Sequence, residues 1–264
     1  MDRGSELRID AKGTTERGSA VVDDLVFAAD PIGEVEAFLV RPVESLRRPG
    51  AGVVWWHWLD SEAPDGNRTE FLEEAVGQAG EGTVSLLLQG RFPWHVDPSA
   101  SSADARQIAD EVLRLRRGLD LLAARPDVDA GRLAVVGHDF GGMLAILALA
   151  ADPRPKGAVI LAPAPRWGDW FLPFWRIEED RIEYLRGLRP FDPVERVGAI
   201  APRQLLFQFA EHDFYLAPMV ELEFRRAAGE TAELKRYPGG HDLKVDAARD
   251  DRRAFLSHLL APGR

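Results

Sequence analysis

The sequence has no cysteine among its 264 residues, which excludes disulfide bridges, thiolate metal sites and cysteine nucleophiles. It also lacks any apolar run near the ~18 residues that a transmembrane helix requires. Its polar opening, MDRGSELRID, lacks the apolar segment of a secretory signal. We therefore expect a cytoplasmic protein, although a chain without cysteine is compatible with any compartment.

The sequence has fewer basic than acidic residues, with 33 Lys and Arg and 43 Asp and Glu, which gives a formal charge of -10. This balance argues against nucleic acid or an anionic membrane as a partner and favours a small-molecule substrate. The sequence contains no G-x-G-x-x-G after its first strand, no P-loop and no histidine pair at metal spacing. We therefore expect neither a cofactor nor a metal.

Short apolar runs alternate with helical patterns, which predicts an α/β fold with a mostly parallel sheet and helices on both faces. Eight strands are expected, at residues 25–28, 34–40, 52–56, 83–88, 133–137, 158–161, 203–209 and 233–237. Helices are expected at residues 69–79, 103–124, 140–151, 220–228 and 246–260. The polar residues 1–20 are expected to form a flexible arm before a single domain over residues 21–264.

One strand runs directly into a glycine-flanked turn and a helix, in the segment LAVVGHDFGGMLAILALA from Leu133 to Ala150. The turn places Asp139 between Gly137 and Gly141. This resembles the nucleophile elbow of the α/β-hydrolases, in which the nucleophile occupies a strained turn that requires flanking glycines. The alternative interpretation is that Asp139 only caps the following helix.

Two further residues occur in the order that this superfamily keeps, nucleophile, acid, histidine. Asp213 follows the predicted strand RQLLFQF, and His241 follows the last predicted strand through Pro-Gly-Gly. The resemblance therefore implies an acid at Asp213 and a catalytic histidine at His241, with Glu211 as the competing acid. His138 and His212 are expected to be structural.

The resemblance extends from about residue 34 to the C-terminus and implies the α/β-hydrolase fold. The layout is most similar to the dienelactone hydrolase branch, with eight strands and a short cap. The elbow GHDFGG is instead similar to that of the epoxide hydrolases and haloalkane dehalogenases, which have an aspartate nucleophile. The two branches imply different reactions.

An aspartate nucleophile favours attack on a saturated carbon, because attack on an ester carbonyl would produce a high-energy anhydride. His241 would then activate water to hydrolyse the ester on Asp139. The backbone N–H of Phe140 is expected to stabilise the resulting oxyanion. The family keeps a His-Gly pair after its third strand where this sequence has His57-Trp58, so Trp58 is the expected second donor and His57 the support of that loop.

An aromatic-rich stretch from Pro163 to Pro190 interrupts the alternation of strands and helices. We expect it to form a cap over an apolar site, with contact between two copies in a homodimer as the other role. The expected substrate-binding residues are His57, Trp167, Trp170, Phe171, Trp175, Tyr184 and Tyr215. Tyr184 and Tyr215 are the candidate acids for epoxide opening.

Halide release requires N–H donors, and Phe140 after the nucleophile has none in its side chain. The sequence therefore favours epoxide-like over halide-like substrates. A lactone or ester hydrolase of the dienelactone hydrolase type remains open, as does a binding protein that has lost catalysis. The presence of Asp213 and His241 argues against the last of these.

Overall fold

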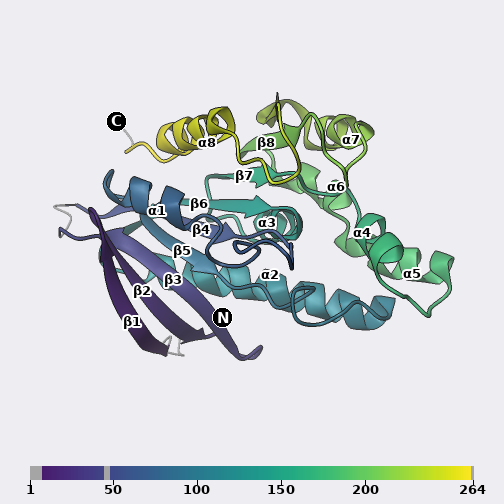
Figure 1. The fold of residues 1–264 in the computed structure, drawn as a ribbon, viewed down its shortest axis with the longest axis horizontal. Helices are drawn as coiled ribbons and strands as arrows, with labels where there is room; N and C mark the ends of the chain where they lie inside the picture. Colours follow the sequence, from purple (N-terminus) through teal and green to yellow (C-terminus); the bar gives the residue numbers. More distant parts are fainter. Residues whose placement is uncertain (1–7, 45–47, 263–264) are drawn as a thin grey trace.

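The computed structural model describes residues 8–44 and 48–262, which fold around a nine-stranded sheet (Figure 1). The strands are β1 (Ile9–Arg17), β2 (Ala20–Ala28), β3 (Glu34–Pro42), β4 (Gly50–Trp56), β5 (Val84–Leu88), β6 (Val128–His138), β7 (Gly157–Leu161), β8 (Gln204–Ala210) and β9 (Ala232–Tyr237). Their order is β1-β2-β3-β5-β4-β6-β7-β8-β9. The first three strands and the β3–β5 pair are antiparallel, whereas all other pairs are parallel. The predicted mostly parallel α/β fold is confirmed.

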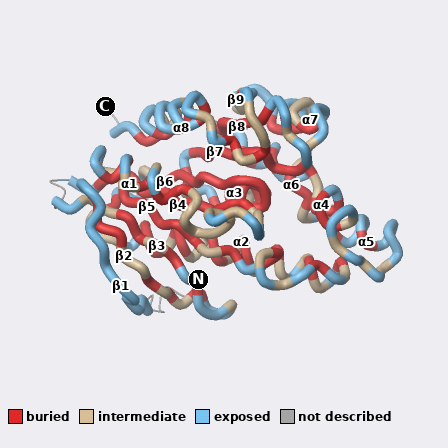
Figure 2. The backbone as a smooth tube through the Cα atoms, viewed as in Figure 1, coloured by how far each residue is buried: buried red, intermediate tan, exposed pale blue. Residues whose placement is uncertain are grey.

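Helices cover both faces of the sheet (Figure 1). The helices that pack on the sheet are α1 (Leu72–Ala79), α2 (Ser101–Ala123), α3 (Phe140–Ala151), α7 (Met219–Ala228) and α8 (Asp246–Leu259). Side chains of α1 and α8 pack with one core cluster, and those of α2, α3 and α7 pack with the other. Helix α3 is buried along nearly its whole length because all its residues are apolar, and Figure 2 shows buried residues concentrated there and in the central strands.

The sheet has nine strands where the sequence predicted eight, because part of the expected arm forms β1. Every residue of Ile9–Arg17 is exposed, so this edge strand has no alternating apolar pattern. Backbone pairing with β2 holds it in place, through a turn at Gly18, where φ is +58°. Residues 1–7 of the predicted arm lie outside the described residues.

The stretch from residue 163 to 190 forms two helices between β7 and β8, α4 (Trp167–Phe174) and α5 (Arg181–Leu188). A short helix, α6 (Pro193–Arg196), follows. Tyr184 of α5 is fully buried, and its hydroxyl donates to Asp104 of α2 at 2.6 Å. The predicted cap segment is therefore anchored to the main body of the fold.

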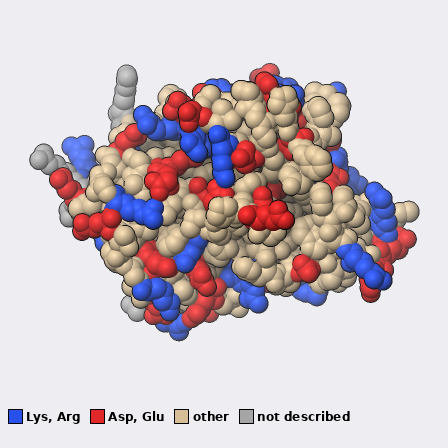
Figure 3. All heavy atoms as spheres, viewed as in Figure 1, with Lys and Arg blue, Asp and Glu red and all other residues tan. Residues whose placement is uncertain are grey.

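Lys and Arg side chains are intermixed with Asp and Glu over the face shown in Figure 3. Among the described residues, no helix combines the length and apolarity needed to cross a membrane.

Candidate active site

Asp139 occupies the sharp turn between β6 and α3, with φ 53° and ψ -117°. A side chain at Gly137 would place its Cβ 2.3 Å from the carbonyl oxygen of Gly141. A side chain at Gly141 would meet the carbonyl oxygen of Trp56 at 2.4 Å. The flanking glycines are therefore required by close backbone contacts, and the turn holds Asp139 in a conformation that L-residues rarely adopt.

The Asp139 side chain does not cap α3, because it accepts no capping hydrogen bond from that helix. Its Oδ2 instead accepts the backbone N–H of Leu59 at 3.2 Å. Burial raises the pKa of Asp139 to about 7, opposed by nearby His241 and by the hydrogen bond from the Leu59 amide. The geometry thus points away from the capping interpretation.

His241 lies between the two carboxylates. Its Nδ1 is 2.8 Å from Oδ2 of Asp213, and its Nε2 is 3.9 Å from Oδ1 of Asp139. Asp213 Oδ1 also accepts the amides of Tyr215 and Leu216. Burial alone would raise the pKa of Asp213, but the hydrogen bond and charge of His241 and these two amides lower it below its usual range.

The competing acid, Glu211, and the neighbouring His212 are both exposed, and neither contacts His241 through a hydrogen bond or ion pair in the described chain. The structure thus brings together Asp139, Asp213 and His241 from loops that follow β6, β8 and β9. All three lie at the carboxyl edge of the parallel strands, where open α/β sheets bind ligands.

In the loop after β4, the backbone N–H that faces Asp139 is that of Leu59 and not that of Trp58, the residue predicted as the second oxyanion donor. The N–H of Trp58 donates to Glu70 Oε2 at 2.8 Å, and the N–H of Leu59, one residue later, faces Asp139. The physical reason lies in the Trp58–Leu59 peptide, whose carbonyl accepts from His57 Nδ1 at 2.8 Å and from Trp94 Nε1 at 2.9 Å. In a trans peptide the N–H points opposite to the carbonyl. These two bonds therefore aim the Leu59 N–H at the carboxylate.

His57 supports this loop, as the sequence suggested, but does not line the cavity described below. The Gly90 N–H donates to His57 Nε2 at 2.9 Å, so Nε2 is the acceptor and Nδ1 carries the proton. Burial lowers the pKa of His57 to about 3. His57 is therefore a neutral residue that orients a peptide, and its predicted place among the substrate-binding residues is corrected.

A cavity of about 360 Å³ opens beside His241. Of the expected site residues, its lining includes Trp58, Phe140, Trp170, Trp175, Tyr215 and His241. The lining also includes residues that the sequence did not single out, namely Leu59, Asp60, Ser61, Pro93, Trp94, Asp97 and Phe174. Several of these lie in the loop after β5, and the rule that ligands bind at carboxyl ends of strands could have identified that loop.

Three other expected lining residues lie elsewhere. Trp167 and Phe171 are fully buried and pack with Phe140, with ring centroids 6.0 and 5.9 Å from it. Tyr184 is held by Asp104 beneath the cap. The face of α4 that carries Trp170 and Phe174 lines the cavity, whereas Trp167 and Phe171 anchor the helix to the domain.

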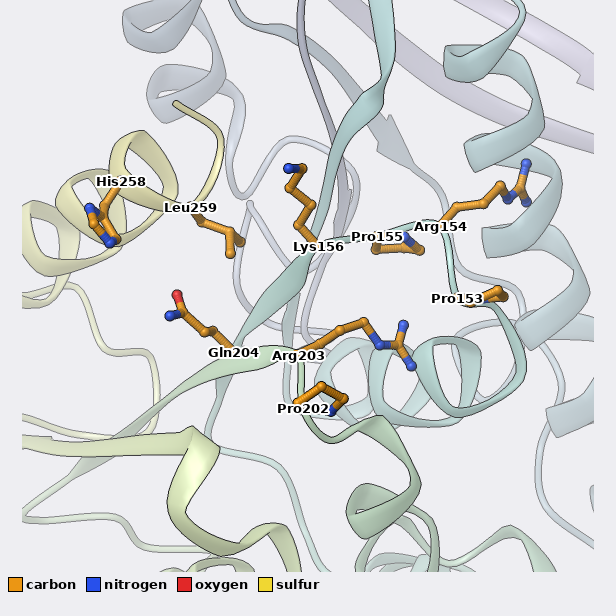
Figure 4. A pocket seen from close by; sticks show the side chains of 9 residues that line it. All are labelled: Pro153, Arg154, Pro155, Lys156, Pro202, Arg203, Gln204, His258 and Leu259. Carbon is orange, nitrogen blue, oxygen red and sulfur yellow. The ribbon is translucent and has the colours of Figure 1, made fainter. Parts of the chain in front are cut away.

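A second hollow lies at the opposite edge of the sheet, where β7 and β8 begin (Figure 4). Its basic residues include Arg154 and Arg203. Arg154 already pairs with Asp152 and Asp120, and Arg203 donates to the carbonyls of Leu149 and Asp152. These guanidinium groups are engaged in holding the end of α3.

No family model matches this chain. The structure is similar to an acetyl xylan esterase from Paenibacillus sp. R4, with a TM-score of 0.74 and 20% identity over 96% of this chain and 89% of that one. It is also similar to an S-formylglutathione hydrolase from Agrobacterium tumefaciens, with a TM-score of 0.71 and 16% identity over 96% of this chain and 100% of that one. A glucuronoyl esterase from Solibacter usitatus has a TM-score of 0.70 and 14% identity over 99% of this chain and 88% of that one. The chain therefore has the α/β-hydrolase fold.

Proposed function

We propose that the protein hydrolyses a small, largely apolar substrate through a covalent ester on Asp139, and that epoxides are the favoured class. The observation that carries this proposal is the different surroundings of the two oxygens of Asp139. Oδ2 accepts the Leu59 N–H, while the buried Oδ1 has no hydrogen-bond partner in the described chain and faces His241.

In the first step, ionised Asp139 attacks a saturated carbon through Oδ1, and the carbon–oxygen bond of the epoxide breaks. A buried carboxylate with one free oxygen suits this step, because it is poorly solvated and needs no base to activate it. A proton donor must supply the departing alkoxide. Tyr215 is the candidate, since it lines the cavity with its ring centroid 5.1 Å from that of His241.

In the second step, His241 Nε2 removes a proton from water, and the hydroxide attacks Cγ of Asp139. Oδ2 becomes the oxyanion and is stabilised by the Leu59 N–H. Collapse of this intermediate breaks the bond between Cγ and Oδ1, and the imidazolium returns its proton to Oδ1, so the alcohol leaves with Oδ1 and the water oxygen stays on Asp139. Loss of the remaining proton from the Asp139 carboxyl and reprotonation of Tyr215 restore the starting state. Asp213 orients the imidazole and stabilises the imidazolium that forms.

Halogenated alkanes are a second candidate class. The indole N–H groups of Trp58 and Trp170 are buried without a hydrogen-bond partner in the described chain, and both residues line the cavity. Such N–H groups could stabilise a departing halide. Phe140 contributes no N–H from its side chain, which weighs against this class.

A lactone or ester hydrolase in which Asp139 acts as a general base is the remaining candidate. The names of the similar structures favour it, since they are two esterases and an S-formylglutathione hydrolase that share this fold. The variant Asp139→Ser separates this candidate from the first. Gain of esterase activity would indicate a site competent for acyl transfer, whereas no gain favours attack on saturated carbon.

A single turnover in H₂¹⁸O, with enzyme in excess over an epoxide such as styrene oxide, tests the covalent step. The proposal predicts an unlabelled product and one ¹⁸O atom in the peptide that contains Asp139. A labelled product with unlabelled Asp139 would instead mean that water attacks the substrate directly, with Asp139 as a base.

A further inference from the structure

A carboxyl–imidazole pair is buried beneath the site and takes no part in the chemistry described above. Glu70, in the turn before α1, places Oε1 2.6 Å from Nδ1 of His138, the residue directly before Asp139. The two side chains are 7% and 0% exposed. A buried pair of this kind would be costly unless its polar atoms were satisfied.

The remaining polar atoms of Glu70 and His138 contact two different loops of the site. Glu70 Oε2 accepts the N–H of Trp58, in the loop that presents the Leu59 donor. His138 Nε2 lies 2.9 Å from the backbone carbonyl oxygen of His241. The Trp58 ring also stacks on His138, with centroids 5.3 Å apart and planes 4° from parallel. One continuous set of contacts therefore joins the donor loop to the histidine loop.

Hydrogen-bond chemistry limits where the protons are. A backbone carbonyl only accepts, so His138 Nε2 carries a hydrogen. One further proton lies between Glu70 Oε1 and His138 Nδ1, and the pair is neutral overall wherever that proton lies. Glu70 Oε2 must then be an acceptor, as its contact with the Trp58 N–H requires.

Burial favours the form without separated charges. It raises the pKa of Glu70 well above its usual range and lowers the pKa of His138 to about 4. The charged groups that face the pair are of mixed sign and include Arg252, Asp65, Glu74, Asp139, Asp213 and Asp242. The proton is therefore assigned to Glu70.

We propose that Glu70 is a positioning residue: as a neutral carboxylic acid it donates to His138 and accepts from Trp58, and thereby holds both the His241 loop and the Leu59 donor in place around Asp139. This inference rests on the proposed function for its kinetic consequence. The pair supports the groups that act in ester hydrolysis and leaves the nucleophilic oxygen, Oδ1 of Asp139, untouched. Its loss should slow ester hydrolysis more than ester formation.

Two substitutions of Glu70 test whether the pair acts in its neutral or in its charged form. In Glu70→Gln, the amide can donate to His138 Nδ1 and accept from Trp58, so both steps should stay within about threefold of wild type. Glu70→Leu removes both contacts. Ester hydrolysis should then fall at least about tenfold, as expected when catalytic groups are misplaced, with ester formation within about threefold.

Glu111→Leu is the matched control. Glu111 is also a buried carboxyl that accepts a backbone N–H, from Arg91 at 3.2 Å. Like Glu70 it does not line the cavity beside His241, but unlike Glu70 it makes no hydrogen bond to Trp58 or His138 in the described chain. Its loss should leave both steps within about threefold of wild type. The positioning role is overturned if Glu70→Leu hydrolyses the ester as fast as this control, or if Glu70→Gln is as impaired as Glu70→Leu.

Histidine ring ¹⁵N spectra of the wild-type protein at pH 7 test the proton assignment without any substrate. We expect a neutral His138 with its hydrogen on Nε2, unchanged in Glu70→Gln. A doubly protonated His138 would overturn the assignment. If wild type forms no ester with any substrate, the proposed function fails, while these spectra still decide the state of the pair.

Discussion

The Nε2 atom of His241 lies 3.9 Å from Oδ1 of Asp139, and both atoms are buried without a hydrogen-bond partner in the described chain. Buried polar atoms without partners carry a free-energy cost, so each of them needs an explanation. Here the two atoms are those that the proposed reaction uses, one as nucleophile and one as base. Hydrogen bonds from the Leu59 N–H to Asp139 Oδ2 and between His241 Nδ1 and Asp213 Oδ2 hold the two side chains in place.

Ester formation should depend on pH through Asp139. Burial raises the pKa of Asp139 to about 7, and only the ionised carboxylate attacks. The rate of substrate consumption in a single turnover should therefore rise with pH, reach half its maximum near pH 7 and fall about tenfold per pH unit below pH 6. A rate that is constant from pH 5 to 9 would contradict this.

The same buried carboxyl should lower stability at alkaline pH. The folded protein binds the Asp139 proton more tightly than the unfolded chain, where a carboxyl titrates near 4. The stability that this gives is present at acid pH and is lost as the pH rises through about 7. Asp139→Asn should therefore be more stable than wild type at pH 8, by about 4 kcal/mol at most, and equal to it near pH 4.

Denaturant unfolding of both proteins at the two pH values measures this difference. Wild type and Asp139→Asn with the same relative stability at pH 4 and pH 8 would show that Asp139 titrates normally.

Replacing Tyr215 and replacing Tyr184 by phenylalanine should have different effects on turnover and on stability. Tyr215→Phe should lower epoxide turnover by a factor of about 100 or more, because it removes the proposed general acid. Tyr184→Phe should leave turnover unchanged but destabilise the fold by about 1–3 kcal/mol, since buried Asp104 loses the Tyr184 hydroxyl and keeps the Ser99 N–H as a donor. Steady-state kinetics and thermal unfolding of both variants test this. Equal losses of turnover in the two variants would remove Tyr215 from the proposed mechanism.

Gly141 should not tolerate a side chain, because a Cβ there would lie 2.4 Å from the Trp56 carbonyl oxygen. Gly141→Ala should therefore lower stability by several kcal/mol or prevent folding. Gly77, inside α1, has no atom within 4 Å of the same position, so Gly77→Ala should raise stability by about 1 kcal/mol. The comparison uses the same substitution in both places. A stable, fully active Gly141→Ala protein would refute the proposed geometry of the turn.

The sequence predicted what depends on local pattern. Strands β4, β5, β7 and β8 are apolar and largely buried, and glycines flank the turn at Asp139, so these features were visible in the sequence. The exposed edge strand β1 was missed because it has no apolar face. The expected cap segment did supply cavity residues, but only from one face of α4 and from Trp175, which follows that helix.

The parts of the site that were not predictable depend on peptide orientation and on contacts between distant segments. The choice of Leu59 over Trp58 as donor follows from the bonds that His57 and Trp94 make to one carbonyl. Glu70 was missed because its partners, Trp58 and His138, lie 12 and 68 residues away in the sequence.

The most direct test of the covalent ester is the intact mass of His241→Ala after incubation with a panel of epoxides and alkyl halides. Without the histidine, an ester on Asp139 should accumulate, with a mass increase equal to the epoxide, or to the halide compound less HX, located in the peptide that contains Asp139. The mass also identifies the leaving group. If no adduct forms while wild type turns over lactones or esters, the covalent ester is contradicted and the ester hydrolase replaces it.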